Sequence, residues 1–161
     1  REYRNRFGVD TRGIRYPGLI SYKAPAGGGT TDYAVEIFHA ALESGHYDCF
    51  VREDTRLPML YMEDAIEATM ALMSADDESL GESRAGYNIP CLSFSAGELA
   101  NAISDRVDGF TCDFAPDERQ EYADSWPDSI DGNVAEREWG WNPQFDLDSM
   151  VDEMLRGISG D

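Results

Sequence analysis

The clearest hydrophobic pattern in the chain covers residues 34–42, where apolar side chains recur every three or four positions. This spacing predicts an amphipathic helix with one face in the core. Thr30 or Thr31 can cap the start of the helix, and Gly45 can end it. His46 follows this stop signal and is expected in a loop.

Three further stretches show helical spacing of apolar residues: 64–73, 99–107 and the segment from 147 onward. Ser95 and Glu98 have the spacing of a capping box ahead of the second stretch. The first stretch places Ile66, Met70 and Met73 on one face, and we expect that face to pack in the core. In the last stretch the expected buried stripe is Met150, Val151, Met154, Leu155 and Ile158.

Extended segments separate these helices. Apolar or alternating runs predict strands over residues 9–20, 47–51, 57–62, 85–90 and 110–114. The glycine-rich segment 24–29 cannot form regular structure and is expected to be a mobile or ligand-shaped loop. Alternating strands and helices predict an α/β fold. With no linker visible, residues 1–161 are treated as one domain.

Charge sets this chain apart from an average protein, because 32 Asp and Glu face 13 Lys and Arg, which gives a net charge of -19. Only Lys23 is a lysine, and the acidic residues are spread along the whole chain. The composition allows two interpretations, an ordinary soluble, acidic cytoplasmic domain or a protein adapted to high salt, where cations screen the repulsion between carboxylates. The near-absence of lysine beside the acid excess favours adaptation to high salt. The same charge argues against partners such as nucleic acid or anionic membrane surfaces.

The cysteines are odd in number and lack metal-binding spacing, which predicts free thiols and no metal site. Cys49 and Cys112 lie in apolar runs and are expected to be buried. Free thiols fit a reducing, cytoplasmic location. No apolar run is long enough to span a bilayer.

The residues before the 34–42 helix allow two interpretations. Thr30, Thr31 and Asp32 can cap the helix and favour its dipole. They can also bind a small ligand that carries a hydroxyl and an ammonium group, with Asp32 pairing with the ammonium. A nucleotide-sugar diphosphate would need converging arginines. Arg52 and Arg56 lie close to acidic residues in the sequence and do not suggest such a site.

Six short motifs occur in order along nearly the whole chain. They are Arg15-Tyr16-Pro17-Gly18-Leu19-Ile20, Gly27-Gly28-Gly29-Thr30-Thr31-Asp32-Tyr33-Ala34-Val35, Thr55-Arg56-Leu57-Pro58-Met59, Tyr87-Asn88-Ile89, Asp124-Ser125-Trp126-Pro127 and Trp139-Gly140-Trp141-Asn142-Pro143. Together these motifs resemble the epimerase-like, extended short-chain dehydrogenase/reductases that act as L-threonine 3-dehydrogenases.

This resemblance implies the C-terminal part of a Rossmann-like, NAD-binding fold together with its substrate-binding subdomain. The implied reaction is NAD-dependent oxidation of L-threonine to 2-amino-3-ketobutyrate. By family position, Thr30 and Asp32 correspond to substrate contacts. Leu19 corresponds to a residue that lines the nicotinamide pocket, with Pro17 and Gly18 nearby.

The resemblance also implies that catalytic parts are missing. The family's Gly-rich loop and Tyr-x-x-x-Lys pair are expected before Arg1, on a missing N-terminal half, and residues 1–7 resemble the end of the catalytic helix. No catalytic residue is therefore assigned here, and we expect the isolated fragment to be inactive. The family implies homodimers formed through that helix. The alternatives are the C-terminal part of a nucleotide-sugar epimerase or dehydratase, and a truncated, non-catalytic interaction module.

Overall fold

The computed structural model describes residues 2–160, in which helices and short strands alternate. The strands are β1 (Ile14–Arg15), β2 (Gly18–Ile20), β3 (His46–Cys49), β4 (Arg56–Tyr61), β5 (Tyr87–Asn88), β6 (Leu92–Ser95) and β7 (Thr111–Phe114). The helices are α1 (Glu2–Phe7), α2 (Tyr33–Glu43), α3 (Met62–Ser74), α4 (Ala96–Ser104), α5 (Arg119–Asp124), α6 (Asn133–Trp139) and α7 (Leu147–Ser159). Two 3-10 turns, Asp77–Ser79 and Glu82–Ala85, lie between α3 and β5. The expected α/β class is confirmed.

The strands form three small sheets. The largest has the order β2-β4-β6, with β2 parallel and β6 antiparallel to the central strand β4. The pairs β1-β5 and β3-β7 are both parallel. Parallel pairing requires a crossover between partners, and the long segments between paired strands supply it.

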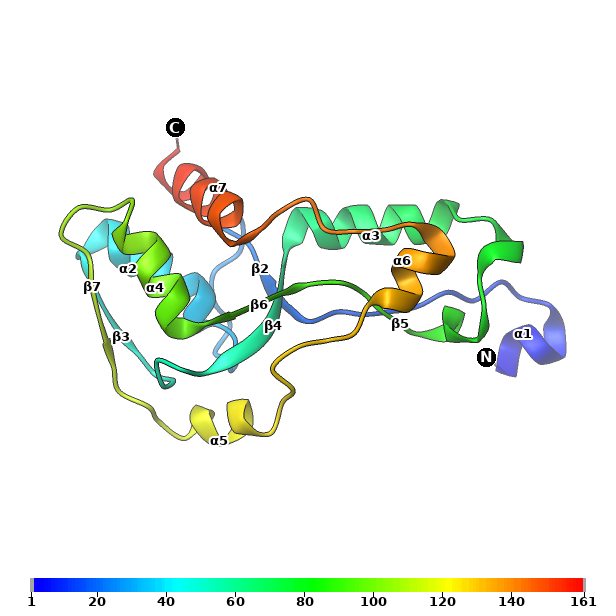
Figure 1. Ribbon diagram of the computed structural model, residues 1–161, viewed down its shortest axis with the longest axis horizontal. Helices are drawn as coiled ribbons and strands as arrows, with labels where there is room; N and C mark the ends of the chain where they lie inside the picture. Colours follow the sequence, from blue (N-terminus) through cyan, green and yellow to red (C-terminus); the bar gives the residue numbers. More distant parts are fainter. Residues whose placement is uncertain (1, 161) are drawn as a thin grey trace.

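The molecule is elongated, and its helices gather in two regions (Figure 1). Helices α2, α4 and α7 pack against one another at one end, where β3 and β7 also lie. Helices α3 and α6 lie toward the other end, near β5 (Figure 1), and β1 lies there too because it pairs with β5. Strands β4 and β6 run between the two regions, so β2-β4-β6 joins them.

Most of the core lies beneath α2, α4 and α7, as the apolar spacing of these helices predicts. The expected stripe of α7 is confirmed, since Met150, Val151 and Met154 are fully buried and Leu155 and Ile158 pack against the same core. The capping box of α4 is also confirmed, because Ser95 and Glu98 exchange hydrogen bonds with each other's backbone nitrogens. Local sequence and packing agree here.

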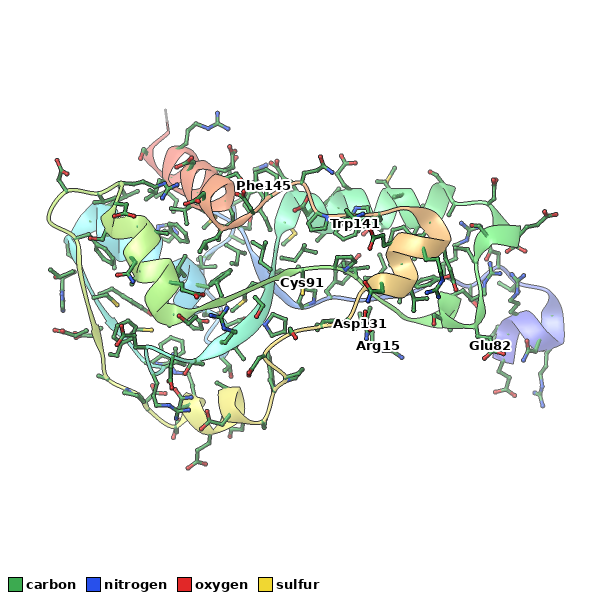
Figure 2. All side chains as sticks on the ribbon, in the orientation of Figure 1. Arg15, Glu82, Cys91, Asp131, Trp141 and Phe145 are labelled. Atoms are coloured by element: carbon green, nitrogen blue, oxygen red, sulfur yellow. The ribbon has the colours of Figure 1, made fainter. Side chains whose placement is uncertain are left out.

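A second core lies between α3, α6 and β5 and includes Leu60, Tyr87 and Trp141. Figure 2 labels Trp141 on the segment that follows α6 and passes beside α3. An arginine connects the segment before β1 to the end of α3. Arg12 donates to the carbonyls of Leu72 and Ala75 at the C-terminal end of α3, which satisfies carbonyls that the helix leaves free.

The prediction for the apolar face of α3 is wrong. Ile66, Met70 and Met73 are 54%, 55% and 66% exposed. The buried face of α3 instead carries Asp64 and small or apolar residues, Ala65, Ala68 and Leu72. Periodicity identified a helix with an apolar stripe, but small alanines let the opposite face approach the neighbouring elements closely.

Two other local expectations are corrected. The single strand predicted over residues 9–20 is two short strands, β1 and β2, which pair in different sheets. Pro17 lies between them and has no backbone N–H to continue a ladder. Val9 lies before β1 and is exposed. His46 does not lie in a loop but begins β3. Of the two apolar-run cysteines, Cys49 is buried as expected and Cys112 is half-buried; both thiols are free. Arg1, the expected start of the first helix segment, lies outside the described residues.

Within residues 2–160, none of the helices combines the length and apolar character needed to cross a membrane.

Candidate functional site

The candidate site lies where β2 leads through the glycine-rich loop into α2. Gly18 opens β2 at a point of very close packing: a Cβ there would lie 2.5 Å from Met59 Sδ and 2.8 Å from Thr31 Cγ2. Only glycine lets β2 sit this near both neighbours. The close approach brings the start of β2 against Thr31, just before α2.

Asp32 occupies the N-cap position of α2, but neither Thr30 nor Thr31 caps the helix through its side chain. The predicted threonine cap is therefore wrong. The Asp32 carboxylate instead accepts hydrogen bonds from the backbone nitrogens of Gly28 (2.5 Å) and Gly29 (2.7 Å). Both bonds run to the same oxygen, Oδ2, and they fold the glycine-rich loop back onto the start of α2.

Gly28 has φ +94°, which side-chain-bearing residues rarely adopt, and a Cβ built on it or on Gly27 would meet no atom within 4 Å. The loop is thus held by the Asp32 carboxylate and not by side-chain packing. Thr30 is half-buried one residue beyond the loop. Asp32 and Thr30 therefore stand at the same loop end, and a ligand carrying a cation could compete with the two glycine N–H groups for Asp32.

The three residues with expected cofactor roles lie together at the start of the central sheet. Pro17 precedes β2, Gly18 pairs with Met59, and Leu19 pairs with Leu60. Leu19 is half-buried and packs against the second core, so part of its apolar side chain stays accessible. Of the three, Leu19 has the side chain that could pack against an apolar ring face such as that of a nicotinamide.

Neighbouring arginines are paired with carboxylates. Arg52 contacts Asp124 at 2.6 Å and Asp54 at 3.4 Å, and Arg56 contacts Glu98 at 2.7 Å. Arg52 and Glu98 line a hollow of about 580 Å³ between the 52–54 turn and α4. Both guanidinium groups are already paired with carboxylates, so neither is free to bind a diphosphate.

The sequence prediction missed the cluster at His46. Its imidazole lies near the carboxylates of Asp48 and Asp113, which come from two different strands. Asp48 alternates with His46 along β3 and so shares its face, which the sequence does contain as a signal. The approach of Asp113 depends on the pairing of β3 with β7, which no local pattern specifies.

Comparison with known proteins gives no match to a family model. The chain is 51% identical over 157 residues to an uncharacterized epimerase/dehydratase of Staphylococcus aureus (strain bovine RF122). That match covers 97% of this chain and 49% of the relative. The chain therefore spans about half the length of the curated relatives it matches.

Solved structures give the same picture. The L-threonine dehydrogenase from Phytophthora infestans superposes with a TM-score of 0.94 at 49% identity, over 99% of this chain and 51% of that one. The holo form of an L-threonine dehydrogenase from Cupriavidus necator has a TM-score of 0.94 at 52% identity, over 98% and 51%. In sequence and in fold, the chain matches the C-terminal half of the extended, epimerase-like short-chain dehydrogenase/reductases, the family that includes these L-threonine dehydrogenases.

Proposed function

We propose that this chain is the substrate-recognising half of an NAD-dependent L-threonine 3-dehydrogenase, which oxidises L-threonine to 2-amino-3-ketobutyrate. The observation that carries the proposal is near-complete coverage of this chain, at about 50% identity, by solved structures named as L-threonine dehydrogenases. The site residues support it, because Thr30 and Asp32 stand together at the end of a glycine-rich loop.

Asp32 is suited to recognise the ammonium group of an amino acid. Its carboxylate accepts hydrogen bonds from two backbone N–H groups, which are neutral donors. An ammonium group brings a positive charge as well as N–H donors, so a ligand ammonium gains a Coulomb attraction to the carboxylate that the loop does not supply. Thr30 then offers a hydroxyl to the carboxylate or hydroxyl of the amino acid.

NAD would supply the hydride acceptor, with Leu19, Pro17 and Gly18 placed to wall the nicotinamide. The chain contains one lysine, Lys23, and the residue four positions before it is Leu19. It therefore contains no Tyr-x-x-x-Lys pair to remove the hydroxyl proton. We propose that this pair and the pyrophosphate loop belong to the half of the relatives that this chain does not match, and that the chain alone is inactive.

A nucleotide-sugar epimerase or dehydratase is the second candidate, favoured by the name of the relative from Staphylococcus aureus. The ion pairs of Arg52 and Arg56 count against it. A diphosphate would have to displace Asp124 from Arg52 and Glu98 from Arg56 before either arginine could bind it.

A chimaera can test the proposal. The chain would be joined to the N-terminal half of the Cupriavidus necator enzyme, and NADH formation would be followed with L-threonine or a UDP-sugar. We expect NADH formation with L-threonine from the chimaera and none from the chain alone. Turnover by the chain alone, or epimerisation of the UDP-sugar without threonine oxidation, would contradict the proposal.

Variants of the chimaera test the role of Asp32. Asp32→Asn removes the charge that pairs with the ammonium group, which costs about 1.5–3 kcal/mol and raises KM about 10- to 100-fold. The control is Glu43→Gln, which neutralises an exposed carboxylate at the other end of the same helix. An equal KM in both variants would remove Asp32 from the substrate site.

A further inference from the structure

A cluster of three potential metal ligands lies on β3 and β7, away from the candidate substrate site. In the parallel pairing, His46 lies opposite Thr111 and Asp48 lies opposite Asp113. Residues two apart on a strand share a face, so His46, Asp48 and Asp113 project from the same side of this two-stranded sheet. Their side chains are 43%, 73% and 81% exposed, which leaves them open to a cation from solvent.

The spacing of the donor atoms is close to what a zinc ion requires. Zn²⁺ binds nitrogen and oxygen at about 2.0–2.1 Å in a tetrahedron, which places ligand atoms about 3.3 Å from one another. His46 Nε2 lies 3.4 Å from Asp48 Oδ1 and 3.9 Å from Asp113 Oδ2. The three donor atoms all lie within 4.8 Å of one another. Small side-chain rotations would complete three corners of the tetrahedron and leave the fourth for water.

The orientation of the imidazole also fits a ligand. His46 Nδ1 lies 2.8 Å from Thr111 Oγ1, whereas the contacts with the two carboxylates are made by the other ring nitrogen, Nε2. With Nδ1 donating its hydrogen to that hydroxyl, the lone pair of the neutral ring resides on Nε2 and points toward the two aspartates. Metal-binding histidines are usually oriented by such a hydrogen bond at the other ring nitrogen.

The electrostatics of the strand pair favour a cation as well. Asp48 and Asp113 are directly opposite on neighbouring strands, and like charges in that position destabilise a sheet. The whole chain adds a net charge of -19. A divalent cation between the two carboxylates would turn this repulsion into attraction.

We propose that His46, Asp48 and Asp113 form a binding site for a borderline divalent cation, with Zn²⁺ as the best fit, which clamps β3 to β7. Imidazole selects Zn²⁺ and similar transition metals over Mg²⁺ and Ca²⁺, which prefer all-oxygen sites. The proposal departs from the sequence prediction of no metal site and is independent of the proposed function.

Calorimetric titration of the untagged, reduced 161-residue chain with ZnCl₂ tests the site, together with thermal unfolding with and without the metal. We expect one Zn²⁺ per chain and a higher Tm. His46→Gln should weaken Zn²⁺ binding at least 10-fold, and Asp48→Asn and Asp113→Asn should each weaken it. His39→Gln is a matched control, because His39 is the other of the two histidines in the chain.

Two results would overturn the proposal. If His46 pairs with the aspartates only as an imidazolium, Zn²⁺ will not bind and Tm will not change. If Zn²⁺ binds through a thiol, Cys112→Ser will abolish binding while His46→Gln leaves it intact. Binding that falls in His46→Gln, persists in Cys112→Ser and is not reproduced by Mg²⁺ would support the site.

Discussion

The carboxylate of Asp64 connects α3 to the segment that leads into α7, and its removal should destabilise the fold. Asp64 is 2% exposed and accepts hydrogen bonds from the backbone nitrogens of Gln144 (2.9 Å) and Phe145 (3.2 Å). Phe145 is labelled in Figure 2 beside the start of α7. Burial raises the pKa of the Asp64 carboxyl, although the two hydrogen bonds act to lower that pKa.

Asp64→Ala leaves both backbone donors without their acceptor. Each unsatisfied buried donor costs about 1–3 kcal/mol. Two reasons place the cost in the lower half of that range. Gln144 is exposed, so water can reach its backbone N–H, and the variant no longer buries a carboxylate. We therefore expect Asp64→Ala to lower the free energy of unfolding by about 2–3 kcal/mol. Asp64→Asn, which keeps one acceptor oxygen, should lose about 1 kcal/mol.

Urea unfolding followed by circular dichroism measures this loss. With an m-value of about 1–3 kcal/mol/M, Asp64→Ala should shift the midpoint down by about 0.7–3 M. Glu67→Ala is the control, because Glu67 is an exposed acid on the same helix. Equal midpoints for Asp64→Ala and Glu67→Ala would refute the reasoning.

Three further predictions follow from contacts and charge. A Cβ on Gly132 would lie 2.1 Å from the backbone nitrogen of Pro90, so Gly132→Ala should lower the free energy of unfolding by about 3 kcal/mol or more. A Cβ on Gly27 meets no atom within 4 Å, so Gly27→Ala should leave stability unchanged, and thermal unfolding of the two variants tests the difference. Arg4 and Arg84 hold the pKa of the Asp77 carboxyl far below its ordinary value of 3.8. The ionised carboxylate therefore stabilises the fold fully above pH 3.8, and this stabilisation is lost as the pH falls toward the lowered pKa. The difference in urea midpoint between the wild type and Asp77→Asn should shrink below pH 3.8. Raising KCl from about 0.1 to about 1 M shortens the screening length from about 10 to about 3 Å. The repulsion among the excess carboxylates of a chain of net charge -19 then weakens, so Tm should rise. A constant Tm would argue against salt adaptation.

The sequence patterns predicted local structure most accurately where one face of a helix is continuous and apolar. The α7 stripe and the capping box at Ser95 both depend on residues within a few positions of one another, so local rules suffice. The face of α3 depends on tertiary contact instead. Ala65 and Ala68 pack that helix against the second core. Because alanine side chains are small, they contribute less to the apolar pattern of the sequence than Ile66 and Met70, which are exposed.

The site was predictable in composition but not in geometry. The glycine-rich loop and Asp32 are visible as neighbours in the sequence. The hydrogen bonds from Gly28 and Gly29 to Asp32 depend on a left-handed turn at Gly28, which glycine permits without specifying. The close approach of Gly18 to Met59 likewise depends on pairing between strands that lie some 40 residues apart.

The uncovered face of α3 has a consequence for the behaviour of this chain in solution. Ile66, Met70 and Met73 form an apolar stripe that attracts other apolar surfaces, while the net charge of -19 keeps copies of the chain apart. Salt weakens the repulsion and leaves the attraction in place. Higher ionic strength therefore stabilises the fold of each molecule but also promotes association between molecules. The best salt concentration for the chain in solution is a compromise between conformational and colloidal stability.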